Sequence, residues 1–423
     1  MKGPRSFVGA LCVAVALAAC AGGALTPATN NFGVRTAVPA TSSSGYQLLY
    51  SFKGTPDAAS PLAGLIALHG KLYGTTLGGS KNYCSQSCGS NGCYLGCGTV
   101  FSVDASGKEH VVYNFRGNFN GAQDGSRPFS PLALLHKKLY GTTSSDGAYG
   151  YGTVFTVSTR GKERVLYNLK GGSDAGSPEA GLTPLNGKLY GATLSGGGSG
   201  CGGPGCGAVF AVTPAGTERV IYGFQGGSDG ERLYSGVTAL HRKLYGATLL
   251  GGSGCGSSGC GTIYEVSLSG KKRTLYTFTG ASDGAYPNGL VAVNNVLYGT
   301  TEGGGARSSG TIFSITPSGT EKTLYTFQDN PDGNGPGADL IYYSGSLYGT
   351  TIGGGTQGDG TVFKVTTSGT ESVLYSFLGG TDGKDPQGPV YLYNNALYGT
   401  TYEGGGTNCT SGTGCGTIFK LNP

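Results

Sequence analysis

The sequence predicts an all-β protein, a seven-bladed β-propeller with four antiparallel strands in each blade. Two short motifs carry this prediction, because each of them occurs seven times along the chain. One is Leu-Tyr-Gly, first seen at Leu72, and the other is Gly-Thr-Val-Phe, first seen at Gly98. Their aromatic residues are Tyr73, Tyr140, Tyr190, Tyr245, Tyr298, Tyr348 and Tyr398, and Phe101, Phe155, Phe210, Tyr264, Phe313, Phe363 and Phe419. Tandem units of roughly 50 residues that are built from strands are typical of propellers.

Composition agrees with an all-β chain. The 84 Gly and 18 Pro among 423 residues would indicate disorder if they had no period. Here the glycines recur at the same places in each unit, which indicates turns. No stretch has apolar residues at helical spacing over three turns, whereas short β-branched and aromatic runs occur throughout.

Each unit contains four candidate strands. In the first unit these are residues 64–68, 72–76, 99–103 and 110–115. The tight turn at His69-Gly70 joins the first two, and the turn at residues 105–108 joins the last two, so both pairs are predicted hairpins.

The two ends of the repeat region predict a closed ring. The fourth-strand motif Leu-Tyr-x-Phe follows six of the seven units, and the seventh ends at Pro423 without one. The missing copy lies before the first unit, at residues 49–52. A solenoid, the competing architecture, has no need of this arrangement. A propeller uses it to pair its first and last segments and leave no open edge, so the N-terminal strand should close the last blade.

Proline positions predict which strand lines the central channel. Pro184 and Pro389 fall in the first strand type, and proline is confined to edge strands because it lacks a ladder donor. The first strand should therefore be innermost, with the others following in sequence order. Both tight turns of each unit then lie on one face, the short-turn face. The loop between the second and third strands and the loop between blades lie on the other, the long-loop face, where binding residues are commonly found.

The N-terminus has the features of an export signal. Residues 1–19 combine Lys2 and Arg5 with an apolar run too short to span a bilayer, as in a signal peptide. Leu17-Ala18-Ala19-Cys20 resembles a bacterial lipobox, which predicts lipidation at Cys20. The alternative is ordinary cleavage near residues 16–18, which would release a soluble secreted protein. Residues 20–45 have the composition of a flexible, lipid-anchored linker, and residues 46–423 form the propeller. The expected location is the cell envelope or surface.

The cysteines predict local disulfides. Ten of the twelve lie between the second and third strands of their units. They are Cys84, Cys88, Cys93 and Cys97, then Cys201 and Cys206, Cys255 and Cys260, and Cys409 and Cys415. Even numbers in an exported protein favour disulfides. The first four are also a candidate zinc site, but they lack the usual C-x2-C spacing.

Each loop between blades contains an Asp at a similar place, in most loops followed by Gly. These residues are Asp57, Asp124, Asp174, Asp229, Asp283, Asp332 and Asp382. They are either a ring of carboxylates for a cation or polar ligand, or caps for their own loops. Repetition in every blade favours the structural interpretation, because one ligand needs different groups from different blades.

Charge at the hairpins is mixed, as in Lys108-Glu109, Glu218-Arg219 and Lys271-Lys272-Arg273. Such turns predict a solvated surface. The formal net charge of +5 gives no nucleic-acid footprint. No cofactor or metal site is expected, the protein should be a monomer, and membrane contact should be through the N-terminal lipid only.

These motifs together resemble a known family. The stretches 283–290, 297–305, 310–313 and 321–327 are similar to the GloVer tandem repeat of bacterial choice-of-anchor surface proteins. The similarity extends over nearly all of residues 46–423. It implies export and attachment at the surface, and it brings no catalytic residues. The second unit departs most, with Ser144-Ser145-Asp146-Gly147 in place of the glycine run.

The function predicted from these features is binding or surface interaction through the long-loop face, with a protein or glycan as the partner. The alternative is a hydrolase or lyase of extracellular polysaccharide that uses acids of the loops between blades. The four histidines, His69, His110, His136 and His241, are placed at or beside the short turns and form no recognisable nucleophile motif. No catalytic residue is therefore assigned.

Overall fold

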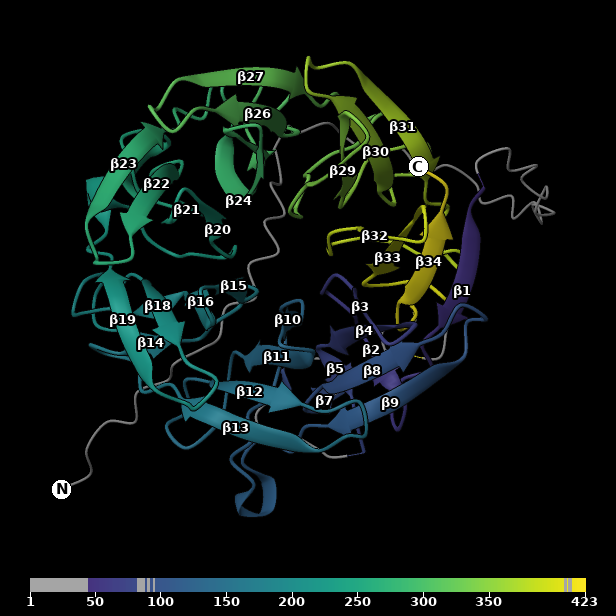
Figure 1. The fold of residues 1–423 in the computed structure, drawn as a ribbon. Coiled ribbons are helices and arrows are strands. Elements are labelled where there is room, and N and C mark those ends of the chain that lie inside the picture. The colour runs from purple at the N-terminus through teal and green to yellow at the C-terminus, as the bar shows by residue number, and fades with distance from the viewer. Residues whose placement is uncertain (1–44, 82–87, 90–91, 94–95, 407–408, 410–412) are drawn as a thin grey trace, which may run out of the picture. The chain divides into compact units, whose positions relative to one another are not determined.

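The structure is a computed structural model that describes residues 45–81, 88–89, 92–93, 96–406, 409 and 413–423. The predicted signal peptide, the linker and Cys20 lie outside the described residues. Within them, seven four-stranded antiparallel sheets are arranged in a ring (Figure 1). The predicted seven-bladed propeller is confirmed.

Strand order follows the sequence in six of the seven sheets, and in the seventh the N-terminal strand takes the outer position. Blade 1 is β3 (Ile66–Leu68), β4 (Lys71–Thr76), β8 (Thr99–Val103) and β9 (Glu109–Asn114). Blade 2 is β10 (Ala133–Leu135), β11 (Lys138–Thr143), β12 (Thr153–Val157) and β13 (Glu163–Asn168). Blade 3 is β15 (Thr183–Leu185), β16 (Lys188–Ala192), β18 (Ala208–Val212) and β19 (Glu218–Gly223). Blade 4 is β20 (Thr238–Leu240), β21 (Lys243–Thr248), β22 (Thr262–Ser267) and β23 (Lys272–Thr277).

The remaining blades repeat the pattern. Blade 5 is β24 (Ala285–Val293), β25 (Val296–Gly303), β26 (Thr311–Ile315) and β27 (Glu321–Thr326). Blade 6 is β28 (Ile341–Tyr343), β29 (Ser346–Thr351), β30 (Thr361–Thr366) and β31 (Glu371–Ser376). Blade 7 is β32 (Tyr391–Tyr393), β33 (Ala396–Thr401), β34 (Thr417–Leu421) and β1 (Gln47–Ser51).

The ring closes through the N-terminal strand, as predicted. β1 pairs antiparallel with β34, with Leu48 opposite Phe419, so the chain's first strand is the outer strand of its last blade. On the opposite side of the same blade, the Thr400 hydroxyl donates to the carbonyl of Ala63 in the segment that leads into blade 1. Blade 7 is therefore joined to the start of the propeller at both its outer and its inner side.

The two repeated motifs are explained by the packing of adjacent strands. Gly74 of the Leu-Tyr-Gly motif lies under the ring of Phe101, and a Cβ at Gly74 would come 2.6 Å from Phe101 Cζ. Thr76, two residues on, shares a 2.7 Å hydrogen bond with Thr99 of the second motif. Glycine thus makes room for the aromatic ring while the two threonines join the strands. Blade 3 has Ala208 at the second threonine position, and its backbone amide donates to the Thr193 hydroxyl instead.

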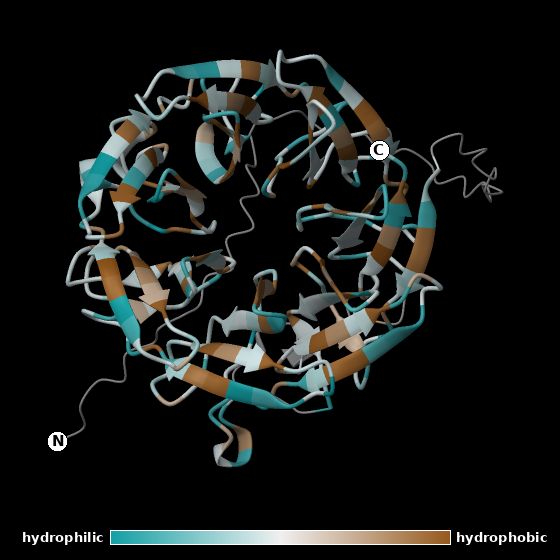
Figure 2. Cartoon of the chain, in the orientation of Figure 1, coloured by the Kyte–Doolittle hydropathy of each residue, from teal (hydrophilic) through white to brown (hydrophobic). Residues whose placement is uncertain are grey.

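Hydrophobic and hydrophilic residues both recur along the strands (Figure 2), and buried apolar residues form clusters that span adjacent blades, such as the one that contains Phe101 of blade 1 and Ile418 of blade 7. The apolar residue that follows each outer strand is fully buried between blades, for example Phe52 at 1% exposure. Phe52 packs edge-on against Phe101 of the next blade, with ring centroids 5.2 Å apart. The same edge-on contact between aromatic rings occurs at six of the seven junctions between blades, and buried Leu169 takes the place of the phenylalanine in blade 2.

One detail of the channel prediction is wrong. Pro184 lies in β15, the innermost strand of blade 3, as expected, but Pro389 precedes β32 and is outside it. Six of the seven inner strands have three residues, fewer than the sequence pattern indicated, because the residues before them turn into the loops between blades, whereas β24 has nine.

Candidate functional site

The long-loop face is built from two kinds of loop that hydrogen-bond to each other. In blade 1 the incoming loop contributes β2 (Ala58–Ala59), which pairs with β5 (Gly78–Gly79) of the loop between the second and third strands. β14 (Ala175–Gly176) and β17 (Ser195–Gly196) repeat this pairing in blade 3. The two loop types therefore lie on one face, and their backbones hold each other in place.

The seven recurrent Asp residues all make the same local hydrogen bonds. In blade 7, the hydroxyl of Tyr50 donates to the Asp57 carboxylate at 2.9 Å, and the backbone amide of Lys53 donates to it at 3.0 Å. The same two donors, a tyrosine hydroxyl and the amide three residues further on, serve the other six carboxylates. Each Asp thereby fastens the start of its loop to the outer strand that precedes it.

Three of the predicted cysteine pairs are disulfides in the structure. They are Cys201–Cys206, Cys255–Cys260 and Cys409–Cys415. Cys97 is also disulfide-bonded. Cys84 and the side chains of Cys88 and Cys93 lie outside the described residues, so the pairing of that group is not assigned.

The disulfides pack on glycines of the loop that leads to the next blade. A Cβ at Gly226 would meet the Cys201 sulfur at 2.9 Å, and one at Gly280 would meet the Cys255 sulfur at 2.5 Å. Blade 2 has no cysteines, and the ring of Tyr151 covers the equivalent Gly171 instead. The disulfide is therefore one of several ways to cover the same backbone position.

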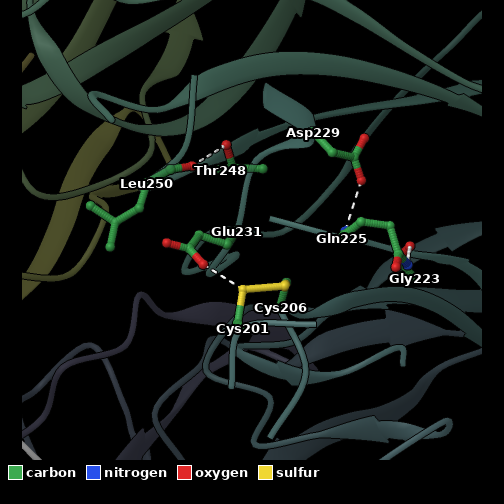
Figure 3. Close-up of a disulfide and its surroundings, with 8 residues drawn as sticks. All are labelled: Cys201, Cys206, Gly223, Gln225, Asp229, Glu231, Thr248 and Leu250. Atoms are coloured by element: carbon green, nitrogen blue, oxygen red, sulfur yellow. Dashed lines mark hydrogen bonds between the residues drawn. A yellow bond between two sulfur atoms is a disulfide. The ribbon is translucent and has the colours of Figure 1, made fainter. Parts of the chain in front are cut away.

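Figure 3 shows the disulfide of blade 3 and the acidic residue beside it. The Glu231 carboxylate contacts the Cys201 sulfur, and Cys201, Cys206 and Glu231 form a cluster of metal-ligand types. The two sulfurs are bonded to each other, so neither is a thiolate that can ligate a metal. This cluster is a structural disulfide with an adjacent acid.

Seven residues at one position form a ring at the inner ends of the blades, here called the channel entrance. Each lies two residues before the pair that opens the inner hairpin of its blade. They are Gly64, Pro131, Gly181, Gly236, Gly289, Asp339 and Pro389. Close approaches between neighbours, such as Gly64 to the Pro389 ring, show that successive members touch. Gly and Pro suit such tight packing, and Asp339 is the single charged residue among the seven.

Asp339 is held against the neighbouring blade. A Cβ at Gly289 would lie 1.9 Å from Asp339 Oδ1, so glycine is required there for the carboxylate to fit. Burial raises the pKa of Asp339 to about 6, and the backbone amide of Gly289, which hydrogen-bonds to the carboxylate, opposes that rise. Two residues earlier in the repeat, Glu179 of blade 3 has its pKa raised by burial to about 7, with Arg127 opposing. Carboxyl groups perturbed in this way cluster at functional sites.

Sequence reasoning did not single out Asp339 or Glu179. The signal was present as a break in the repeat, because an acid replaces the Gly or Pro of the other blades at Asp339. The recurrent pattern indicated the seven loop Asp instead, whose carboxylates accept hydrogen bonds that hold the loops in place. The four histidines are exposed at or next to the short turns, away from the channel entrance on the long-loop face.

A protein-family model described as the Gloeobacter/Verrucomicrobia repeat matches residues 22–204 and 202–419 of the chain. No curated protein matches it.

Among solved structures, a protein described as the extracellular domain of a putative hybrid two component system from B. thetaiotaomicron aligns with a TM-score of 0.56 at 11% identity. That alignment covers 89% of this chain and 39% of the other, so the chain spans about two fifths of that structure's length. A luciferin-regenerating enzyme aligns at 16% identity with a TM-score of 0.44 over 69% of this chain and 90% of its own. A GH74 enzyme from Niastella koreensis aligns at 14% identity with a TM-score of 0.47, covering 78% and 46%. At 11% identity the likeness to the extracellular domain is one of fold.

Proposed function

The chain belongs to the Gloeobacter/Verrucomicrobia repeat family, and from this premise we propose that it is an exported, lipid-anchored propeller that binds a protein or glycan at the cell surface through its long-loop face. The disulfides support export, since such bonds persist in oxidising compartments. Lipid on Cys20 is the anchor in this proposal. Among the described residues, no helix has the length and apolarity to cross a bilayer.

The observation that carries the binding proposal is the position of Asp339. Six of the seven residues around the channel entrance are Gly or Pro, which pack tightly and offer no side-chain polar group. The seventh is a part-buried carboxyl whose pKa is raised by burial to about 6. Burying an acid at this position costs desolvation energy. The fold does not require the acid, because the other six blades have Gly or Pro at the same position. A polar ligand at the channel entrance gives that acid a use.

The polysaccharide hydrolase alternative depended on acids of the loops between blades. Each recurrent Asp accepts hydrogen bonds from a tyrosine hydroxyl and a backbone amide of the outer strand and loop that precede it. A carboxylate engaged in this way serves the loop, and no observation favours it as a general acid or base.

The experiment is a binding screen of the exported chain against arrays of glycans and cell-surface proteins. Asp339→Asn should reduce binding to any ligand found by at least about tenfold, the usual loss when one charged hydrogen bond is removed. Lys271→Ser, on the exposed short-turn face, is the matched control and should bind like the unaltered chain. Equal binding by Asp339→Asn, or loss with Lys271→Ser, would move the site away from the channel entrance.

A further inference from the structure

In blades 1 to 6 the first residue of the outer strand faces the neighbouring blade, and this was not expected from the sequence. The charged hairpins were predicted to be solvated, but the turn before each outer strand packs on the preceding blade. A Cβ at Gly107 would lie 2.4 Å from the Leu49 carbonyl of β1, and Gly161, Gly216, Gly270, Gly319 and Gly369 make the equivalent approach. The side chain that begins the outer strand is therefore directed into the seam between two blades.

Blade 4 shows what this side chain reaches. Lys272 begins β23, and its Nζ lies 2.8 Å from Oδ1 of Asp229, the recurrent Asp of the preceding blade. The side chain of Lys272 is only 6% exposed, so this ion pair is inside the seam. A residue at this position therefore lies against the recurrent Asp and Tyr of the preceding blade.

In five other blades the same position is occupied by glutamate. These residues are Glu109, Glu163, Glu218, Glu321 and Glu371. Each faces the recurrent Asp and Tyr of the preceding blade, so two carboxyl groups meet where blade 4 has a salt bridge. In the closing blade the equivalent residue is Tyr46, directly before β1, and its hydroxyl donates to the Asp382 carbonyl.

Two buried carboxylates in contact repel each other unless a proton is shared. The Oε1 atoms of Glu109, Glu163, Glu218 and Glu371 are shielded from solvent and have no hydrogen-bond partner within the described part of the chain. A protonated glutamate removes the repulsion and can donate a hydrogen bond to the facing Asp. Glu321 differs, since its Oε1 accepts a bond from the Thr323 hydroxyl.

We propose that the five Glu–Asp pairs are proton-dependent seams, which hold adjacent blades together in mildly acidic surroundings and loosen the ring as the pH rises above neutral. The Lys272–Asp229 seam and the Tyr46 seam do not share this dependence, because neither contains a second carboxyl group.

The charged groups around each glutamate agree with the proposal. Glu109 faces Asp57, Tyr50 and Lys53, and Glu218 faces Asp174, Tyr167 and Lys170. For both, burial and then the facing Asp raise the pKa to about 8.

The remaining three seams differ in their cations. Glu163 faces Asp124 and Tyr113, with Arg116 and Arg164 opposing, and Glu371 faces Asp332 and Tyr325 with no cation among the opposing groups. For Glu163 and Glu371 the pKa is raised, first by burial, to about 7. Glu321 faces Asp283 and Tyr276, and burial raises its pKa.

The direction of the pH effect follows from these shifts. A glutamate whose pKa is higher in the folded protein than in the unfolded chain binds more protons when folded. The folded state is then most stable below the unfolded value of about 4.5 and loses that advantage as the pH rises through about 7 to 8. Each such group changes the unfolding equilibrium by up to about tenfold per pH unit in this window.

The test measures the melting temperature of the full chain between about pH 5 and about pH 9, which roughly spans the window of these shifts. The unaltered chain should lose stability steadily with rising pH. Glu109→Gln with Glu218→Gln should flatten the profile, because glutamine keeps the shape and donates a hydrogen bond without needing a proton. Asp104→Asn should leave the slope unchanged, because hydrogen bonds from Ser106 and Lys108 hold the pKa of this exposed carboxyl below its usual value and it stays ionised throughout this range. Lys272→Glu, which creates a sixth acid pair, should steepen it.

Two results would overturn the proposal. One is a pH profile that is the same in the unaltered chain and the double glutamine variant. The other is a rise in melting temperature at about pH 8, the pKa of Glu109 and Glu218, when millimolar Ca²⁺ is added to the unaltered chain but not to the double variant. That result would show that the pairs hold a cation in place of a proton.

Discussion

Lys272 Nζ lies 2.8 Å from Asp229 Oδ1 across the seam between blades 3 and 4, and it also donates to the Asp229 carbonyl and to the Thr274 hydroxyl. The ammonium group thus donates to acceptors in both neighbouring blades. Asp229 in turn accepts from Tyr222, the tyrosine that fastens its own loop. Lys272 therefore connects the hydrogen-bonded pair Asp229 and Tyr222 of blade 3 to blade 4.

Replacing Lys272 with Met should destabilise the protein by about 2 kcal/mol, because a part-buried Asp229 would lose its counter-charge. Chemical unfolding monitored by tyrosine fluorescence measures the change. Lys271→Met, one residue earlier and exposed, is the matched control and should change the free energy of unfolding by less than about 0.5 kcal/mol. Similar losses in both variants would contradict a specific role for the seam.

Deleting residues 46–52 should lower the melting temperature sharply. The deletion removes β1, and with it the stacked pair Tyr46–Tyr375 at 3.8 Å and the buried Phe52. Loss of Phe52 alone is expected to cost about 3 to 5 kcal/mol. Leu48→Ser, at a side chain 38% exposed in the same strand, should have a small effect. An unchanged melting temperature after the deletion would mean that the ring does not depend on its closing strand.

Asp283→Ala should cost about 2 to 3 kcal/mol, because it leaves three donors without an acceptor inside a nearly closed site. Those donors are the Tyr276 hydroxyl and the amide and hydroxyl of Thr279. Tyr276→Phe removes only the first of them and should cost about 1 kcal/mol. The difference between the two variants, measured by thermal unfolding, isolates the loop cap. Equal costs would show that the two bonds from Thr279 contribute nothing.

Opening the Cys255–Cys260 disulfide by replacing both residues with Ser should reduce stability by about 2 kcal/mol in the chain-entropy model for so small a ring. The loop around Gly280 should also become more sensitive to proteolysis, since the sulfurs cover that backbone. Mass spectrometry of the cleaved chain reports the site. Cleavage elsewhere at the same rate in both proteins would argue against local stiffening.

Cys20→Ala should move the protein from the membrane fraction to the soluble fraction if Cys20 carries the anchoring lipid. Cys12→Ala, within the predicted signal peptide, is the control and should leave partitioning unchanged. Fractionation followed by detection of the chain measures both. Unchanged partitioning of Cys20→Ala would remove lipid at Cys20 from the proposed function.

Predictions of the fold succeeded where a residue's role is local and repeated. Gly74 with Phe101, and Thr76 with Thr99, act within one blade, so their pattern along the chain was enough to place the strands. The prediction that the hairpin charges are solvated holds for Lys271 but fails for Glu109, because Glu109 looks the same in sequence whether its strand faces solvent or a neighbouring blade. Asp339 was overlooked because it stands out only when its position is compared across all seven blades, six of which have Gly or Pro there.

The sequence by itself determined the number of blades, the order of strands and the closure by residues 49–52, since these follow from counting motifs whose geometry is local. Only the tertiary structure decided which charged groups meet. Glu109 and Asp57 are 52 positions apart in number, and Thr400 and Ala63 are 337 apart, yet each pair spans one seam. The physical reason is that contacts between blades depend on the relative position of adjacent blades in the ring. The sequence of a single repeat does not determine that position.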